Sequence, residues 1–468
     1  MTRDVLDRAR RSRDARFDGK FFIAVTSTRI YCRSICPAKT SKDANIRYYA
    51  TAAEASAAGF RPCLRCRPEA APGSPAWLGT SAVVRRALRL IQDGALDHGS
   101  VEELAMRLGV GSRHLSRLFT RHVGASPLAV AHTRRLHFAK QLLDETDLPI
   151  TRIALGSGFG SVRRFNDVFK ATYHRSPREI RKATRRSADA EIKLRLTYRP
   201  PYDWQLISHA LARRAIEGVE SVTADRYERT VHGANGHAIV TVSPIADADA
   251  LELRIRGGES SELLSLASSV RRMFDLCADP AKIAEVLRRD PHLAPDVARH
   301  PGLRIPGHWD LFEGAVRLLL DLADSRQAPK RLTALVHRAG SPISDATDAL
   351  HRLFPLPQEL ARADLAELGF GAALANSLHC FARDVTGRLT VSEALQTVEI
   401  QRILRTVPID VGLLIEGLSL YGLGDPDAFP LAAPPGNRAQ LWRPFRGYAA
   451  LYLGDIAGPN TAGSRLPP

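Results

Sequence analysis

Four closely spaced cysteines constrain this chain more than any other feature of its sequence. They form two pairs, C-x₃-C at Cys32 and Cys36 and C-x₂-C at Cys63 and Cys66. Two close pairs separated by a loop are typical of a tetrahedral Cys₄ zinc site. A pair of disulfides is the alternative, but nothing in the sequence indicates an oxidising compartment, and reduced thiols bind metal. We therefore expect all four cysteines to hold one Zn²⁺.

The first residues give no sign of export. The segment MTRDVLDRARRSRD is charged and lacks the apolar region of a signal peptide. No run of eighteen apolar residues occurs anywhere in the chain, so we expect no membrane span. These observations predict a cytoplasmic protein that does not contact membranes.

Positive charge is concentrated in the first two-fifths of the chain. Residues 1–190 hold 35 lysines and arginines against 17 acidic residues, a net charge of +18, whereas the remainder carries −2. Basic charge confined to one region predicts a polyanionic partner, and double-stranded DNA is the polyanion that fits best. A general role in solubility would not explain the confinement.

Two segments between residues 81 and 182 repeat each other and predict a duplicated helix-turn-helix. Three apolar residues of the first segment recur fifty positions later: Leu115, Leu118 and Phe119 correspond to Phe165, Val168 and Phe169. Their i, i+3, i+4 spacing places each triplet on one face of a helix. A glycine precedes each triplet, Gly109 in the first unit and Gly158 in the second, and supplies the turn between two steeply crossing helices.

The polar faces of the two expected recognition helices carry side chains suited to DNA. These are Ser112, Arg113, Ser116 and Arg117 in the first unit and Ser161, Arg163, Arg164 and Asn166 in the second. Arginine and asparagine pair with guanine and adenine edges, and serine suits phosphates. For any one arginine, a phosphate-facing or solvated role is an equal alternative.

Two such units in one chain reach successive major grooves without a second subunit, so we expect a monomer. The stretch GFGSVRRFNDVFKATYHRSP resembles the AraC-type activator domain. That resemblance implies transcription activation, with RNA polymerase as a partner.

The cysteine region resembles the methyl-acceptor domain of Ada-type adaptive-response proteins. The resemblance covers Arg16 to Pro68 and rests on ARFDGKFFIAVTSTRIYCRSICPAKT and GFRPCLRCRP, in which all cysteine intervals agree. It departs at Arg29, where a glycine is usual. The resemblance implies that Cys32 is both a zinc ligand and the nucleophile that takes a methyl group from a DNA methylphosphotriester. A plain zinc-containing transcription factor, in which the metal only folds the domain, is the alternative.

The C-terminal half resembles AlkA-type 3-methyladenine DNA glycosylases over residues 194–453. LRLTYRPPYDW resembles the start of that family's small α+β domain, and GDPDAFP and WRPFRGYAALYL resemble parts of its helical domain. Within the small domain, Asn235-Gly236 is expected to turn a hairpin. The resemblance implies a helix-hairpin-helix that grips DNA and an aspartate that stabilises the sugar cation during base release.

Several positions depart from the glycosylase pattern. Ile409 and Val411 replace the two hairpin glycines, and Ala433 falls on the position of the catalytic aspartate. Alanine cannot replace a carboxylate, so we expect a glycosylase-like fold without base excision. An active DNA-3-methyladenine glycosylase is the alternative. Leu303 or Ile305 is the candidate wedge against the duplex, unless both belong to the core.

The expected fold class is multidomain, mainly α with α+β parts. The expected domains are an Ada-type zinc methyl-acceptor module (1–75), an AraC-type double helix-turn-helix (76–186), a small α+β domain (190–258), a glycosylase-like helical domain with a helix-hairpin-helix (259–453) and a disordered tail (454–468). The function implied by these resemblances is a DNA alkylation-damage response in which repair by Cys32 switches on transcription of repair genes.

Overall fold

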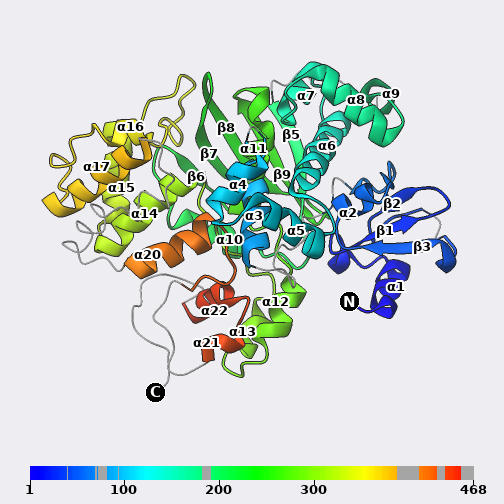
Figure 1. The fold of residues 1–468 in the computed structure, drawn as a ribbon. Helices are drawn as coiled ribbons and strands as arrows, with labels where there is room; N and C mark the ends of the chain where they lie inside the picture. The colour runs from blue at the N-terminus through cyan, green and yellow to red at the C-terminus, as the bar shows by residue number, and fades with distance from the viewer. Residues whose placement is uncertain are drawn as a thin grey trace.

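Three consecutive segments of the chain follow one another in the computed structural model (Figure 1). The structure describes residues 1–38, 41–68, 71, 82–92, 94–97, 99–181, 191–386, 411–429 and 438–454. The segments are termed the metal module (residues 1–71), the reader (82–181) and the C-terminal unit (191–454). Among the helices in these ranges, none combines the length and the apolar character that a membrane crossing requires.

The metal module is a four-stranded sheet with a helix on each face. Its elements are α1 (Arg3–Ser12), η1 (Ala15–Phe17), β1 (Phe22–Val25), β2 (Ile30–Cys32), η2 (Asp43–Asn45), β3 (Ile46–Tyr49), α2 (Ala52–Ala57) and β4 (Arg61–Pro62). The strand order is β3-β1-β2-β4, and of these pairs β2 and β4 are parallel. Alternate residues of β1 point to opposite faces, so Ile23 packs with Ala9 of α1 and Phe22 with Ala55 of α2.

The reader confirms the expected duplication. It comprises α3 (Ala82–Gln92), α4 (Val101–Arg107), α5 (Ser112–Val123), α6 (Pro127–Glu145), α7 (Ile150–Gly156), α8 (Val162–Tyr173) and α9 (Pro177–Ile180). Helices α4–α5 and α7–α8 are the two helix-turn-helix units, and the long helix α6 joins them. The turn glycines Gly109 and Gly158 have φ angles of 67° and 77°, in the left-handed region that favours glycine.

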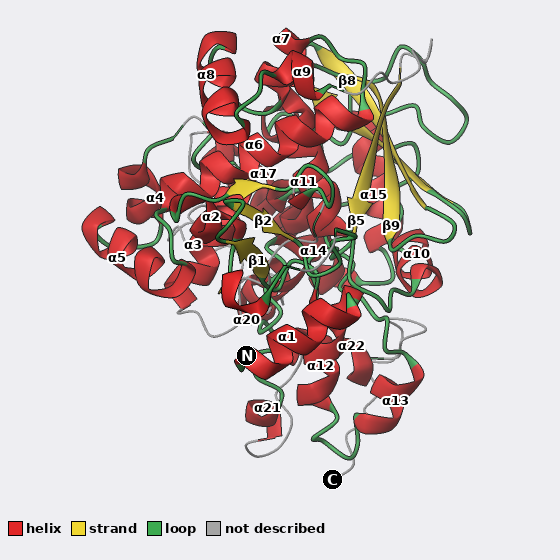
Figure 2. Ribbon diagram, turned by 90° about the vertical axis from the view of Figure 1, so that its right-hand side faces the viewer, coloured by secondary structure: helices red, strands yellow, loops and turns green. Residues whose placement is uncertain are grey.

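The C-terminal unit begins with a five-stranded antiparallel sheet, well separated from the sheet of the metal module (Figure 2). It comprises β5 (Glu191–Thr197), α10 (Trp204–Ala212), β6 (Glu220–Val222), β7 (Tyr227–Gly233), β8 (Gly236–Pro244) and β9 (Ala250–Gly257), in the order β5-β9-β8-β7-β6. Gly233 pairs with Gly236, so Ala234 and Asn235 make the hairpin turn. The expected Asn235-Gly236 turn was therefore displaced by one residue, because Gly236 remains in the strand ladder.

The rest of the C-terminal unit is helical. Its elements are η4 (Ser260–Glu262), α11 (Leu263–Met273), α12 (Pro280–Leu287), α13 (Ala294–Arg299), α14 (Leu311–Asp324), α15 (Ala328–Ala339), α16 (Pro357–Leu360), α17 (Ala372–Thr386), α20 (Val411–Gly417), the π-helical turn η5 (Leu418–Gly422), α21 (Arg438–Leu441) and α22 (Arg446–Leu453). Leu303 and Ile305 are buried in a core with Trp442 and Tyr448. The wedge hypothesis is therefore wrong for this structure, and both residues contribute to packing. The proposed tail after Gly454 lies outside the described residues.

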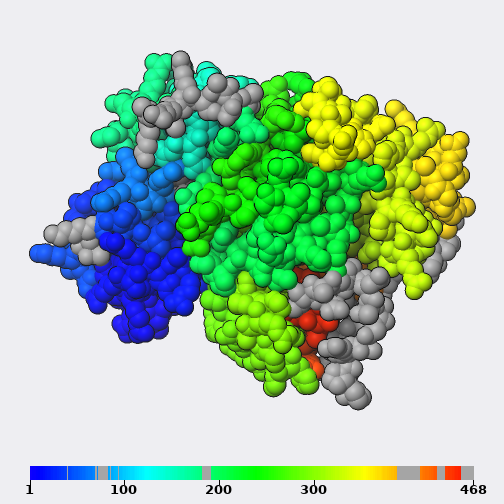
Figure 3. Space-filling model, turned by 180° about the vertical axis from the view of Figure 1, so that it is seen from behind, coloured from blue at the N-terminus to red at the C-terminus, as the bar shows by residue number. Residues whose placement is uncertain are grey.

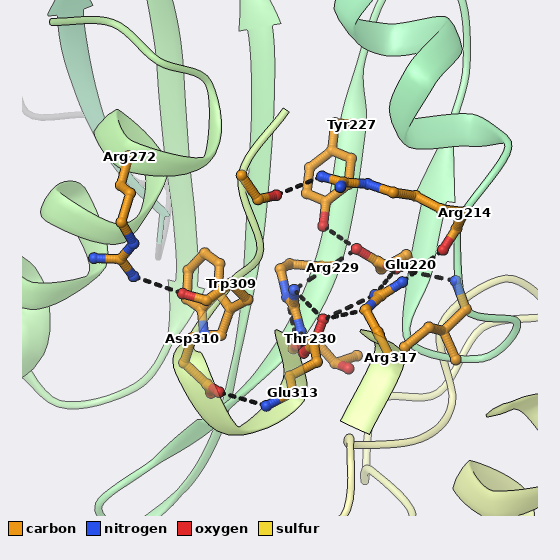
Figure 4. A network of polar contacts seen from close by, with 12 residues as sticks. Arg214, Glu220, Tyr227, Arg229, Thr230, Arg272, Trp309, Asp310, Glu313 and Arg317 are labelled. Atoms are coloured by element: carbon orange, nitrogen blue, oxygen red, sulfur yellow. Dashed lines mark hydrogen bonds and ion pairs between the residues drawn. The ribbon is translucent and has the colours of Figure 1, made fainter. Parts of the chain in front are cut away.

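A buried ion network joins the sheet of the C-terminal unit to helix α14 (Figure 4). Arg229 Nη2 donates to Glu313 Oε2 at 2.7 Å, and Arg317 Nε donates to Glu313 Oε1 at 2.9 Å. Arg317 also pairs with Glu220 of β6. Burial alone would raise the pKa of Glu313, but the two arginines outweigh it and lower the pKa to about 2. Because loss of one charge would leave its partners buried and unpaired, the network fixes the sheet against α14.

Candidate functional site

The four predicted ligands meet at one end of the small sheet in the metal module. Strand β2 ends at Cys32 and Cys36 follows it, while Cys63 and Cys66 follow β4. Since β2 and β4 are adjacent and parallel, the two pairs emerge side by side. The four Sγ atoms lie within 4.8 Å of one another. Zn–S bonds of about 2.3 Å would separate tetrahedral sulfurs by roughly 3.8 Å, so the cluster fits a zinc ion.

The four sulfurs differ in their exposure. Cys63 and Cys66 are buried, with 8% and 6% of their surfaces exposed, whereas Cys32 and Cys36 are partly exposed. An external substrate could therefore reach only the first pair.

The residues on either side of Cys32 connect it to other parts of the molecule. Tyr31 is fully buried, and its hydroxyl lies 2.7 Å from His137 Nε2 on helix α6 of the reader. Arg33 donates its backbone N–H to Cys66 Sγ at 3.3 Å and pairs through its guanidinium with Asp18. Sequence reasoning missed His137 and Asp18, because no local pattern in the sequence marks either contact.

Helix α6 of the reader contacts the metal module through ion pairs. Arg67 Nε lies 2.8 Å from Asp144 Oδ2, and Arg67 Nη2 lies 2.9 Å from Glu145 Oε1. Glu145 also accepts the backbone N–H of Arg195 in β5 at 2.9 Å. The end of α6 therefore contacts both the metal module and the C-terminal unit.

The predicted DNA-contacting residues lie where the repeat analysis placed them. On α5, Arg113 and Arg117 are exposed while Ser112 and Ser116 are partly buried. On the second unit, Ser161 accepts the backbone N–H of Arg164 as the N-cap of α8, and Arg163, Arg164 and Asn166 are exposed. Helices α5 and α8 lie on the same side of the molecule (Figure 2). The structure therefore leaves the polar side chains of both sets open to solvent, apart from the partly buried Ser112 and Ser116.

The predicted glycosylase positions are only partly described. Ile409 and Ala433 lie outside the described residues, and Val411 is the first residue of helix α20. The two acids of the GDPD turn, which lie close to Ala433 in the sequence, form ion pairs. Asp427 Oδ1 lies 2.9 Å from Arg446 Nε, and Asp425 Oδ1 lies 3.6 Å from Arg89 Nη2 of the reader. Both carboxylates thus have structural partners.

Family models match three successive parts of the chain. The metal binding domain of Ada matches residues 6–69, a helix-turn-helix domain matches residues 104–183, and the AlkA N-terminal domain matches residues 193–310. The first match contains the whole cysteine cluster, which is therefore the zinc site of an Ada-type domain. The second contains both recognition helices and makes the reader a DNA-binding unit.

Curated relatives match either nearly the whole chain or one part of it. A Mycobacterium tuberculosis (strain ATCC 25618 / H37Rv) protein described as "Probable bifunctional transcriptional activator/DNA repair enzyme AlkA" is 37% identical over 95% of both chains. The "DNA-3-methyladenine glycosylase 2" of Escherichia coli (strain K12) is 30% identical over 55% of this chain and 95% of its own length. The "Bifunctional transcriptional activator/DNA repair enzyme Ada" of the same organism is 36% identical over 32% of this chain and 40% of its own length.

The ligand cluster, the two recognition helices and the whole-chain identity agree with one another. This chain belongs to the family of bifunctional transcriptional activators and DNA repair enzymes that joins an Ada-type metal-binding domain and a helix-turn-helix reader to an AlkA-type C-terminal half.

Proposed function

We propose that this protein repairs DNA methylphosphotriesters by transferring their methyl group to Cys32 and that the methylated protein activates transcription of repair genes. The observation that carries this proposal is a partly exposed sulfur within a four-cysteine cluster, next to a DNA-binding reader. Cys36 is comparably exposed, and the resemblance at IYCR favours Cys32 as the acceptor.

The reaction is a direct displacement at carbon. Zinc, when bound, keeps the coordinating thiols deprotonated at neutral pH. The Cys32 thiolate attacks the methyl carbon, the S–C bond forms, the C–O bond breaks and a phosphodiester anion leaves. A thioether does not return the methyl group, so each molecule reacts once.

Methylation also changes the charge that the metal module presents to DNA. Four thiolates around Zn²⁺ carry a charge of about −2, and one methyl group reduces it to about −1. Less negative charge facing phosphates strengthens binding. Under this proposal the eight polar residues of α5 and α8 named above contact the operator, a single protomer suffices, and RNA polymerase is the partner of the bound activator. The domain boundaries given from the sequence belong to the same proposal.

The test is the mass of the peptide that contains Cys32. After incubation with methylphosphotriester DNA, this peptide should gain one methyl group and the peptide with Cys63 and Cys66 should gain none. Cys380→Ser, which changes a buried cysteine of α17, should react normally. An unmodified Cys32 peptide in zinc-loaded protein would favour the plain transcription factor.

We further propose that the C-terminal unit does not excise alkylated bases, because Ala433 stands at the expected acid and the nearby Asp425 and Asp427 are held in ion pairs. The 30% identity to a glycosylase over most of that enzyme's length supports the alternative of an active enzyme. Release of 3-methyladenine from alkylated DNA separates the two. We expect none, whereas excision that is lost in Asp427→Asn would identify a displaced catalytic acid.

A further inference from the structure

The metal module contacts the C-terminal unit through the loop of residues 18–20. Arg199, which follows β5, is fully buried and donates from Nε to the backbone oxygen of Asp18 at 2.9 Å. Its Nη1 donates to the backbone oxygens of Cys277 and Ala278 at 3.0 and 3.2 Å. One guanidinium therefore joins the two units at a point sealed from water. In Figure 3 the metal module, in blue, lies directly against the green surface of the C-terminal unit.

A buried ion pair reinforces the same contact. Lys20 Nζ lies 2.6 Å from Asp279 Oδ1, and the two side chains are 9% and 1% exposed. Asp279 is also the N-cap of α12, where it accepts the backbone N–H of Lys282. A buried charge that loses its partner is strongly destabilising, so this pair penalises separation of the units far more than an exposed pair would.

Asp18 of the same loop also connects to the zinc site through Arg33. The Asp18 carboxylate accepts from Arg33 Nε at 2.9 Å. Arg33 in turn donates from its backbone to Cys66 Sγ at 3.3 Å and from Nη1 to the Cys66 carbonyl at 3.2 Å. Arg33 directly follows the proposed acceptor Cys32. A continuous series of hydrogen bonds thus runs from Arg199 of the C-terminal unit to a zinc ligand.

We propose that the C-terminal unit acts as a docking platform for the metal module. Arg199 and Asp279 hold residues 18–20, and Asp18 holds Arg33 against the cysteine cluster. These side chains position the site and do not react. This role requires neither base excision nor methyl transfer, so it gives the C-terminal unit a function even where the glycosylase acid has been replaced.

The test is a double-mutant cycle in the full-length, zinc-loaded protein. The variants are Lys20→Met, Asp279→Asn and the two together, with Lys20→Arg as a rescue that keeps the charge. Arg299→Met is the control, since it removes an exposed ion pair with Asp296 in the same C-terminal unit. Two quantities are measured: deuterium exchange of amides in residues 17–36 and the rate of zinc release to a coloured chelator.

We expect each single variant to speed both processes by about tenfold, because either change leaves one buried partner uncompensated. The double variant should resemble the more severe single variant, since both remove the same contact. Lys20→Arg should retain most of the protection, and the Arg299→Met control should behave as the parent protein.

Three results would overturn the proposal: unchanged exchange in residues 17–36, effects that add in the double variant, or faster exchange confined to the C-terminal unit. Methyl transfer to Cys32 is measured separately in the same samples. A protein that shows the exchange effects without methyl transfer would refute the proposed function and leave the docking platform intact.

Discussion

The metal module and the C-terminal unit differ in how many of their expected reactive groups the chain contains. In the metal module all four ligand sulfurs are present and lie within 4.8 Å of one another. The C-terminal unit keeps its framework, including the buried pairs of Glu313 with Arg229 and Arg317, while Ala433 stands at the proposed acid position. Packing is spread over many side chains, whereas catalysis depends on single atoms, so a fold alone does not establish its chemistry.

The two units also differ in what stabilises them. The metal module has two small clusters of buried apolar side chains, one on each face of its sheet. The C-terminal unit has two larger clusters, around α14 and α22, and shares a third, around α11, with the reader. A unit as small as the metal module buries little apolar surface, so we expect its stability to depend on its metal.

Removal of zinc should give the largest difference between the two units. A structural zinc ion contributes about 10 kcal/mol or more to a small domain, so chelation should unfold the metal module. Deuterium exchange is expected to show lost protection in β1 and β3 and retained protection in β8 and β9. Adding back Zn²⁺ should restore the protection, and Mg²⁺, which prefers oxygen ligands, should not. Protected β1 amides in zinc-free protein would contradict the prediction that the metal module depends on zinc for its fold.

Loss of one buried charge in the C-terminal unit should give the next largest effect on stability. Glu313→Gln leaves two arginines partly unpaired and should lower the free energy of unfolding of the C-terminal unit by about 3–5 kcal/mol. Urea unfolding can be followed by tryptophan fluorescence, because Trp204, Trp309 and Trp442 lie in this unit. The control Glu367→Gln, which removes an exposed pair with Arg338, should change stability by less than about 1 kcal/mol. Equal effects of the two substitutions would show that the buried network stabilises the C-terminal unit no more than an exposed ion pair does.

Acid should weaken the C-terminal unit through the same carboxylate. The folded-state pKa of Glu313 is lowered to about 2 from an ordinary value of 4.5 by Arg229 and Arg317, against the opposing effect of burial. A lowered carboxyl pKa stabilises the fold above the unfolded value, and this stabilisation is lost as pH falls from about 4.5 towards 2. The urea midpoints of the parent protein and Glu313→Gln should therefore converge over this range. If the two urea midpoints instead fall in parallel as the pH is lowered, Glu313 is not the group that makes the C-terminal unit sensitive to acid.

Substitution of Arg29 should have the smallest effect. Arg29 has a φ of 55°, in the left-handed region that favours glycine, the residue expected at this turn from the family resemblance. Glycine would relieve a left-handed strain of about 1 kcal/mol, but it would lose a contact of about 0.5–1 kcal/mol with the Phe60 ring, whose centre lies 5.5 Å from Arg29 Cζ. Arg29→Gly should therefore shift the thermal midpoint of zinc-loaded protein only slightly. A large loss of stability would indicate a further role for this arginine.

Local patterns predicted much of the reader and of the ligand set. The fifty-residue repeat placed Phe119 and Phe169 in the core, and both are fully buried. Helical periodicity predicts burial here because residues three and four positions apart lie on the same face of a helix, and one face of each helix packs into the core. The hairpin of β7 and β8 was correctly expected, but its turn was wrong by one residue, because Gly236 stays in the strand ladder as the partner of Gly233.

The sequence by itself determined the ligands and the recognition helices, because cysteine spacing and helical periodicity act over a few residues. Only the tertiary structure decided what surrounds Cys32. Tyr31 meets His137 on the reader, and Asp18 meets Arg199 on the C-terminal unit, although more than a hundred residues separate each pair along the chain. Such contacts depend on how distant segments of the chain pack against each other, and no local spacing along the chain encodes that packing.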